Sequence, residues 1–441
     1  MFNYNNIQVI KFISIIKTIF NLMKPNTFLQ YLLVFYAYFF CIQGNVIFSQ
    51  NSKKIVVKNE LAIDRMDEPV ILKRSQLIKI LNWTDSEIPV VLNSSSTIVP
   101  QQFDDINGDE IWDEIYFLVD IKSKDSLIYE IKTMDKRKLP DFQFRTNVHF
   151  AAKPQNENDK YVELKFAKRL NTNESNVSQK NFQFEGPGWE NDKVAFRNYF
   201  DLRNGIDIFG KKTNAMVLEK AGYKGQNYHE LSDWGMDILK VGNSLGAGAL
   251  AIATKDTIIR VGSSGTGTYK LITQGPLRSE LLFEYDSIEI GKRIVKMSWY
   301  ISISAGTRCY ESQVFTKGLN ENEFIISGIV NKHSDSLIAL NQYNYVILAT
   351  HGNQTESAKG EKLGMAIITE NSNFLDFGET PKSGNGITET YFCMFKKNTG
   401  IRYYFFSCWE YEYSNFAKSE AFVNEMKEFS LKKSSPLLVK F

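Results

Sequence analysis

Cysteine and histidine are scarce in this sequence. Its 441 residues include four of each, and only Cys309, Cys393 and Cys408 follow the first 50 residues. So few cysteines do not make a disulfide framework, and Cys309 and Cys393 are expected to be buried in strands. With no cluster of cysteine and histidine, a zinc site is not expected. The content of only 10 prolines and 27 glycines excludes a collagen-like chain and a long disordered tail.

The chain also has almost no net charge. It contains 52 lysines and arginines against 50 acidic residues, so no overall basic field favours nucleic acid as a partner. Residues 1–50 hold three of the lysines and no acid, which leaves 49 basic and 50 acidic residues in the remainder. An acidic ligand would therefore have to be bound by a local group of basic side chains.

The first 50 residues are typical of a secretory signal segment. The best start is Met23-Lys24, so residues 1–22 are interpreted as an over-extended start. The apolar stretch 28–42 is shorter than the roughly 20 residues of a membrane-spanning helix. We therefore expect cleavage near Ser49 or Gln50, a periplasmic or secreted protein, and no stable membrane span afterwards. An uncleaved anchor is the alternative.

Strand-like runs dominate the chain after residue 50. Within 292–304, Met297, Trp299 and Ile301 alternate with Ser298 and Tyr300, which is typical of a strand with one buried face. Other runs rich in aromatic and β-branched residues are 115–121, 143–150, 161–166, 323–330, 343–350, 363–369, 390–395 and 402–409. They predict a mainly β protein in which residues 51–441 form one large antiparallel β-sandwich domain.

Helices are expected at two places only. Phe422, Met426 and Phe429 recur at helical spacing and predict a short C-terminal helix that begins at Ser419. The stretch 69–81 is a second candidate, with Pro69 in its first turn.

An acidic segment resembles the beginning of a calcium-binding loop. Asp105, Asn107, Asp109 and Asp113 occupy positions 1, 3, 5 and 9 of such a loop, but Tyr116 stands where the last ligand should be a glutamate. One interpretation is a structural Ca²⁺ site, and the other is an acidic hairpin turn. No cofactor is required in either case.

The segment 182–210 combines aromatic side chains with charges of both signs. At strand spacing Lys193, Arg197, Tyr199 and Arg203 would face one way, and arginine can bind a carboxylate through two hydrogen bonds. Trp189 follows a Gly-Pro-Gly sequence and is expected at a turn, where it could stack on a sugar. These residues are candidates for binding an acidic sugar, and a solvated face with cross-strand ion pairs is the alternative.

A third segment contributes candidates for proton transfer. His229 is flanked by Tyr228 and lies near Trp234, and histidine suits proton transfer near neutral pH. We take His229, Tyr228 and Tyr199 as candidate catalytic residues, with Trp234 and Arg278 as further contacts of the substrate. His149 is an alternative base.

Three motifs carry a resemblance to a known family. They are FEGPGWENDKVAFR (184–197), DLRNGIDIFGK (201–211) and YHELSDWGMDILKVG (228–242), and together they resemble domain-of-unknown-function family 4861. The resemblance implies a protein of bacterial polysaccharide breakdown with a β-supersandwich similar to that of galactose mutarotase. It also implies an oligosaccharide dehydratase activity.

These observations lead to one hypothesis and two rivals. The hypothesis is a lyase that removes water by β-elimination from oligosaccharides that contain uronic acid. The first rival is a glycoside hydrolase with a carboxylate pair such as Glu190 and Asp233. The second is a non-catalytic carbohydrate-binding protein in which Trp189 and Trp234 stack on sugars. The oligomeric state is left open.

Overall fold

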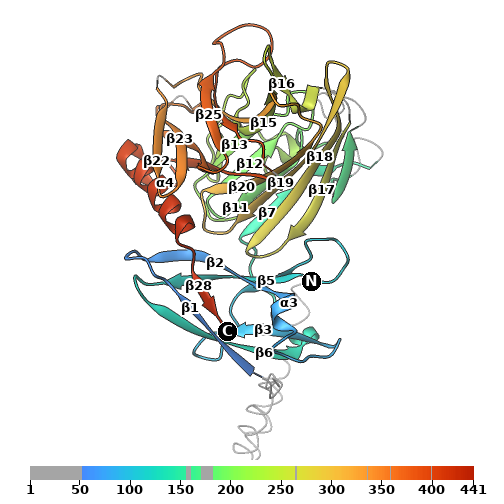
Figure 1. Cartoon of the computed structure of the whole chain (residues 1–441), viewed down its shortest axis with the longest axis vertical. Coiled ribbons are helices and arrows are strands. Elements are labelled where there is room, and N and C mark those ends of the chain that lie inside the picture. The colour runs from blue at the N-terminus through green and yellow to red at the C-terminus, as the bar shows by residue number, and fades with distance from the viewer. Residues whose placement is uncertain are drawn as a thin grey trace, which may run out of the picture.

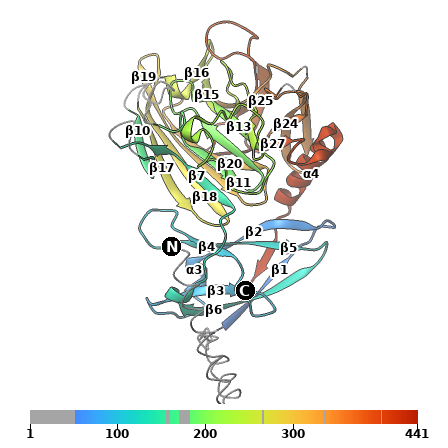
Figure 2. The same cartoon turned by 180° about the vertical axis from the view of Figure 1, so that it is seen from behind.

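Antiparallel strands form most of the chain. The computed structural model describes residues 52–154, 160–169, 182–263, 266–334, 336–357, 359–398 and 400–441. The predicted signal segment 1–50 lies outside these residues. Figure 1 shows a smaller and a larger β-rich body stacked on each other, and Figure 2 shows the same two bodies from behind. The predicted mainly β fold with antiparallel sheets is confirmed.

The smaller body is a sandwich of two sheets from the two ends of the described chain. One sheet has the order β28-β1-β6-β3, with bounds Leu438–Lys440, Ser52–Lys58, Ser126–Asp135 and Glu87–Leu92. The other has the order β2-β5-β4, with bounds Arg65–Lys73, Glu114–Ile121 and Gln101–Asp104. A one-turn helix, α3 (Arg74–Leu77), follows β2 directly. Their facing apolar side chains, such as Ile55 and Phe117, form a separate hydrophobic core.

The larger body is built on a nine-stranded sheet. Its order is β10-β17-β18-β19-β20-β27-β24-β23-β22, with bounds Phe166–Arg169, Gly267–Gln274, Arg278–Ile290, Arg293–Ser304, Cys309–Lys317, Ile401–Trp409, Leu363–Glu370, Tyr345–Gly352 and Ile338–Gln342. The predicted strand alternation is confirmed in β19, where Trp299 and Ile301 are buried while Tyr300 and Ser302 are half-buried on the other face.

Two five-stranded sheets cover the inner face of the nine-stranded sheet. One has the order β14-β13-β12-β11-β7, with bounds Gly235–Asp237, Ile206–Lys211, Val194–Asn198, Gly188–Asn191 and Thr146–His149. The other has the order β16-β15-β21-β26-β25, with bounds Ile258–Arg260, Ala247–Ala253, Phe324–Val330, Thr390–Phe395 and Phe374–Glu379. A short pair, β8 (Ala151–Ala152) and β9 (Val162–Glu163), stands apart. The main hydrophobic core lies between these layers and includes Trp189, Trp299 and Trp409.

Helix α4 (Ser419–Ser434) packs on part of the outer face of the nine-stranded sheet. Its Phe422 and Met426 are fully buried in a cluster with Cys309 and Cys408 of that sheet. The predicted C-terminal helix is therefore confirmed, and Cys309, Cys393 and Cys408 are buried free thiols. In both views α4 leads from the larger body to β28 in the smaller one.

The two bodies meet through polar contacts and one inserted side chain. Leu277, in the turn before β18, is buried in the core of the smaller body. The N–H groups of Leu277 and Arg278 both donate to Oε1 of Gln102 at 2.8 Å. The hydroxyl of Tyr116 donates to Oγ of Ser304 at 2.9 Å. The smaller body is thus fixed over one end of β18 and β19.

One detail differs from the expectations. Residues 69–73 belong to strand β2, so the predicted helix over 69–81 is reduced to the single turn α3, because Pro69 lies within an extended strand paired with Leu118. Among the described residues, no helix is both long and apolar enough to cross a membrane. The organisation of 51–441 as one domain stays a prediction, although the two bodies have separate cores.

The alternation in β19 predicts a large difference between neighbouring positions. Trp299→Ala removes a fully buried ring and should lower the free energy of unfolding by about 3–5 kcal/mol. Tyr300→Ala, on the half-buried face, should cost less than half as much. Guanidinium unfolding of both variants measures the difference, and equal losses would contradict the assigned faces.

Candidate functional site

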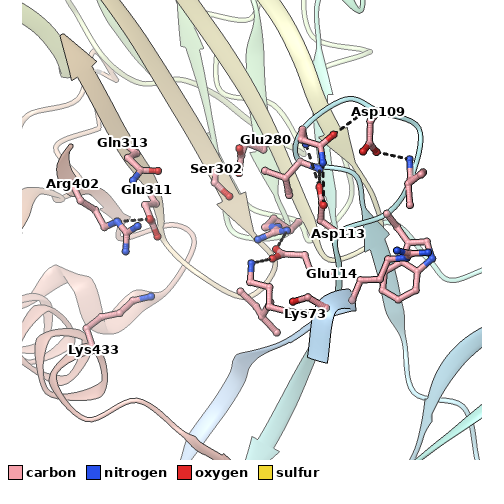
Figure 3. Close-up of a pocket in the computed structure, with 18 of the residues that line it drawn as sticks. Lys73, Asp109, Asp113, Glu114, Glu280, Ser302, Glu311, Gln313, Arg402 and Lys433 are labelled. Carbon is pink, nitrogen blue, oxygen red and sulfur yellow. Dashed lines mark hydrogen bonds and ion pairs between the residues drawn. The ribbon is translucent and has the colours of Figure 1, made fainter. Parts of the chain in front are cut away.

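A polar cavity lies where the smaller body covers the outer face of the nine-stranded sheet. Its volume is about 950 Å³. The sheet contributes side chains from β18, β19, β20 and β27, the smaller body contributes β2, α3 and the acidic loop, and α4 contributes Lys433 (Figure 3). The lining side chains used below are Lys73, Arg74, Asp109, Asp113, Glu114, Arg278, Glu280, Ser302, Glu311, Arg402, Tyr404 and Lys433.

One cross-strand row of side chains forms the floor of this cavity. Glu280 pairs with Ser302, Ser302 with Glu311, and Glu311 with Tyr404 on four adjacent strands. Neighbouring strands lie about 4.8 Å apart, so directly paired side chains on one face are close neighbours. The alternation that buries Trp299 in the core therefore turns Ser302 and its neighbours toward the cavity.

Glu280 is a carboxyl group of the cavity whose pKa is raised. Within the described part of the chain its carboxyl group has neither a hydrogen-bond partner nor an ion-pair partner. Burial raises the pKa of Glu280 to about 7, an effect that Arg278 opposes and that Glu311 reinforces. A carboxyl group that is open to a cavity and titrates near neutral pH is suited to general acid–base catalysis.

Three of the cations that line the cavity are already paired with carboxylates. Arg278 binds Asp104 with its Nε at 3.1 Å and Glu114 with its Nη2 at 2.6 Å. Lys73 also pairs with Glu114. Nε of Arg402 lies 3.0 Å from Oε1 of Glu311. These pairs fix the walls of the cavity and hold the pKa of Glu114 below its usual range, against the opposing effect of burial.

Two other cations in the cavity have no carboxylate partner among the described residues. Arg74, in α3, lies with its guanidinium 5.5 Å from the ring centre of Trp112, and its buried Nε has no hydrogen-bond partner. Lys433, near the end of α4, lies above the rings of Tyr404 and Phe429. Arg74 belongs to the smaller body, whereas Lys433 belongs to α4.

The acidic loop lines the cavity but does not have the arrangement of a metal site. Oδ1 and Oδ2 of Asp105 accept from the N–H groups of Gly108 and Glu110, and Oδ1 of Asp109 accepts from Ile111. Oδ1 of Asn107 likewise accepts from the backbone of Asp109, and Oδ2 of Asp113 accepts from Ile106. In the described ranges no group of three or more His, Cys, Asp or Glu is placed to hold a metal ion. The oxygens of Asp105, Asn107, Asp109 and Asp113, the residues of the predicted Ca²⁺ site, accept hydrogen bonds from the backbone of their own loop.

A second polar cluster is built on strands β12, β13 and β14 of the first five-stranded sheet. Arg197 is fully buried and makes ion pairs with Asp207, with Glu185 at 2.9 Å and with Asp237 at 3.6 Å. Three carboxylates thus face one guanidinium. Burial and the neighbouring Asp207 raise the pKa of Asp237 well above its usual range, because the single cation cannot compensate all three charges.

This cluster unites four of the residues selected from the sequence. Nη1 of Arg197 donates to the hydroxyl of Tyr228 at 3.2 Å, and the guanidinium lies 5.2 Å from the ring centre of Tyr199. Nδ1 of the exposed His229 lies 3.6 Å from Oδ2 of Asp237. The charge of Arg197 is nevertheless already compensated by buried acids, so Arg197 is poorly suited to bind the carboxylate of a substrate.

Two further selected residues lie at the edge of the same cluster. Arg203 stacks on Tyr199 at 3.8 Å and lies 3.4 Å from Glu185. Trp234 packs on Phe209 and is half-buried.

The structure corrects three placements. Trp189 lies in strand β11 and is fully buried in the main core, so the expected turn is wrong and no sugar can reach its ring. Strand β12 ends at Asn198, and Nζ of Lys193 lies 4.0 Å from Glu412, so 193–203 do not form one strand face. Arg278 belongs to the cavity and not to the cluster around Arg197. Of the rival carboxylates, Glu190 is fully buried against Lys211.

The comparisons with known proteins identify the family. The chain belongs to the family described as a domain of unknown function (DUF4861), which matches residues 57–439. The uncharacterized protein P7 of Formosa agariphila is 28% identical over 151 residues, a match that covers 30% of this chain and 38% of that protein. The matched region is thus well under two thirds of that relative.

Two solved structures from Enterococcus faecalis are among those that match this chain in a structural comparison. One is a protein in glycosyl hydrolase family 38, with 7% identity and a TM-score of 0.47, covering 89% of this chain and 47% of that chain. The other is an alpha-mannosidase, with 8% identity and a TM-score of 0.45, covering 90% and 46%. This chain spans about half the length of each.

The raised pKa of Glu280 predicts a stability that falls with pH. The folded protein holds the Glu280 proton up to about pH 7, whereas an unfolded glutamate releases it near 4.5, so the free energy of unfolding decreases as pH rises through this window. Glu280→Gln keeps the size and removes the titration. Its advantage over the wild type in melting temperature should be larger at pH 8 than at pH 4, and an identical pH dependence of both proteins would contradict the assignment.

The cluster around Arg197 predicts a structural role for that guanidinium. Arg197→Met removes the cation shared by three buried carboxylates and should cost about 3–5 kcal/mol in the free energy of unfolding. His229→Ala, at an exposed position, should change it by less than about 0.5 kcal/mol. Chemical denaturation of both variants tests the contrast.

Proposed function

We propose that this protein is a secreted or periplasmic enzyme that removes water by β-elimination from oligosaccharides that contain uronic acid. The carboxyl group of Glu280 carries this proposal. It lies in the polar cavity between the two bodies, which we call the seam cavity. The activity is the one that the family resemblance implies, and the location and the oligosaccharide partner are parts of the same proposal.

The chemistry needs a proton-transfer group and a positive charge near the substrate carboxylate. In the elimination the C5–H bond breaks, its electron pair forms the C4–C5 double bond, and the C4 hydroxyl leaves as water. A carboxylate at Glu280 can take the C5 proton and pass it to the departing oxygen if both bonds face the same side. With a pKa of about 7, this carboxyl group can accept the C5 proton and then donate it to the departing oxygen at neutral pH.

Arg74 is the cation that we assign to the substrate carboxylate. Its guanidinium lines the same cavity and has no acidic partner among the described residues. A guanidinium can bind a carboxylate through two parallel hydrogen bonds, and it stabilises the negative charge that develops when the C5 proton is removed. Lys73, Arg278 and Arg402 are less suitable because Glu114, Asp104 and Glu311 already neutralise them.

One observation favours a glycoside hydrolase as a second candidate. Glu280 and Glu311 lie two strands apart in the floor row, a separation of roughly 9–10 Å between their backbones. Inverting hydrolases use two carboxyl groups about 6.5–9.5 Å apart. In this mechanism Glu311, which pairs with Arg402, would be the general base and Glu280 the general acid.

The products of the reaction decide between these functions. Purified protein is incubated with a panel of uronate oligosaccharides, and the ultraviolet absorbance of the conjugated C4–C5 double bond is followed. We expect this absorbance to appear without an increase in reducing ends. New reducing ends without it would identify a hydrolase, and binding without either product would identify a carbohydrate-binding protein.

The role of Glu280 is tested with two matched variants. Glu280→Gln should lower kcat by about 10²–10⁴-fold, and the wild-type pH–rate profile should show a group with a pKa near 7. Glu284→Gln is the control, since Glu284 lies on the same strand, pairs with Lys270 and does not line the cavity.

His229→Ala distinguishes the two candidate locations. If the seam cavity is the active site, this variant should keep nearly wild-type activity. Loss of activity in His229→Ala with full activity in Glu280→Gln would move the site to the cluster around Arg197.

A further inference from the structure

We propose that Lys433 binds an acidic group on the sugar unit next to the one at Glu280, so that the enzyme prefers oligosaccharides with two neighbouring acidic positions over single uronates. This inference rests on the function proposed above. It assigns to the end of α4 a part in substrate specificity.

The ammonium group of Lys433 is held in place without being neutralised. Its Nζ lies 5.0 Å from the ring centre of Tyr404 and 5.3 Å from that of Phe429. Within the residues that the structure describes, no carboxylate lies within ion-pair distance of it. Aromatic faces attract a cation but leave its charge available to an anion. A side chain that is already positioned loses less entropy when a ligand binds.

Three acids that line a hollow together with Lys433 already have cationic partners. Glu428 pairs with Lys432 at 2.6 Å, and Glu311 pairs with Arg402 at 3.0 Å. Glu425 lies 3.2 Å from Nη1 of Arg308. None of these three acids forms an ion pair with Lys433.

Lys433 stands at the junction of two hollows. The seam cavity and a smaller one of about 140 Å³ are both lined by Ser302, Glu311, Tyr404 and Lys433. The smaller hollow lies between the smaller body and α4, on the same face of the nine-stranded sheet. A chain of sugars that enters the seam cavity can thus continue past Lys433.

The floor row places Lys433 and Glu280 too far apart to act on one sugar unit. Glu280 and Tyr404 are three strands apart, which is about 14 Å across the sheet. Lys433 lies over Tyr404, at the far end of this row, and Figure 3 shows its side chain extending from α4 toward Arg402 and Glu311. The anion at Lys433 must then belong to a different unit from the one whose proton passes to Glu280.

The test compares Lys433→Met with the wild type on three substrates. These are an oligosaccharide with uronates on adjacent units, the same oligosaccharide with its carboxyl groups outside the reacting unit reduced to alcohols, and a single uronate glycoside. A hydrogen bond to a charged group is worth about 1.5–3 kcal/mol, so KM for the first substrate should rise about 10- to 100-fold in Lys433→Met. The value of kcat should stay within about twofold, and KM for the other two should hardly change. Lys433→Arg should restore most of the affinity.

A matched control and a binding measurement complete the design. Lys427→Met removes a lysine of the same helix that lines neither hollow, and its KM should equal that of the wild type. Calorimetric titration of Glu280→Gln with the first substrate, with and without Lys433→Met, measures the affinity without turnover.

Two outcomes separate the inference from the proposed function. Equal KM values for Lys433→Met and the wild type on the first substrate would overturn the role of Lys433 and leave the dehydratase intact. A wild-type protein that binds the first substrate but never forms the unsaturated product would overturn the proposed reaction. If the wild type binds the first substrate without reacting, weaker binding by Lys433→Met would still support the contact between Lys433 and an acidic group of the neighbouring sugar unit.

Discussion

The ion pairs of Arg278 with two carboxylates of the smaller body determine where the cavity lies. Asp104 ends strand β4 and Glu114 begins strand β5, and both accept from the guanidinium of Arg278 at the start of β18. These bonds dock the smaller body onto the edge of the sheet face that carries Glu280. The guanidinium also lies over the ring of Tyr116 at 4.5 Å, which fixes its plane. A buried charge with two acidic partners cannot slide without breaking strong bonds, so the seam has a defined width.

The period of two along a strand links the stability of the larger body to its chemistry. In β18, β19, β20 and β27 every second residue enters the main core, as Leu281, Trp299, Tyr310 and Phe405 do. The residues between them form the floor row. The core side chains therefore hold the polar ones in register, and strands of this length keep Glu280 and Glu311 at a fixed separation.

Much of the architecture could be predicted from the sequence, because β alternation and helical spacing are local signals. The faces of β19 and the helix from Ser419 follow directly from residue order. Arg197 contacts Tyr228, although 31 residues separate them, and no local signal in the sequence predicts this contact. Trp189 was misplaced because a Gly-Pro-Gly sequence indicates a turn, whereas a strand begins at its last glycine. Glu280 gave no signal of its own, because its environment arises from Asp104, Glu114 and Glu311, which are distant in sequence.

The pairing of β28 with β1 makes the order of synthesis matter. Val56 pairs with Lys440 and Val57 with Val439, so a strand formed at the start of the described chain acquires its neighbour from the end. The same final segment carries the backbone oxygen of Ser435 that accepts from the buried Arg65 of β2. During translation the edge of β1 stays open until residues 438–440 have emerged. Such long-range closure slows folding, and until β28 pairs with β1 the free edge of β1 can pair with strands of other chains.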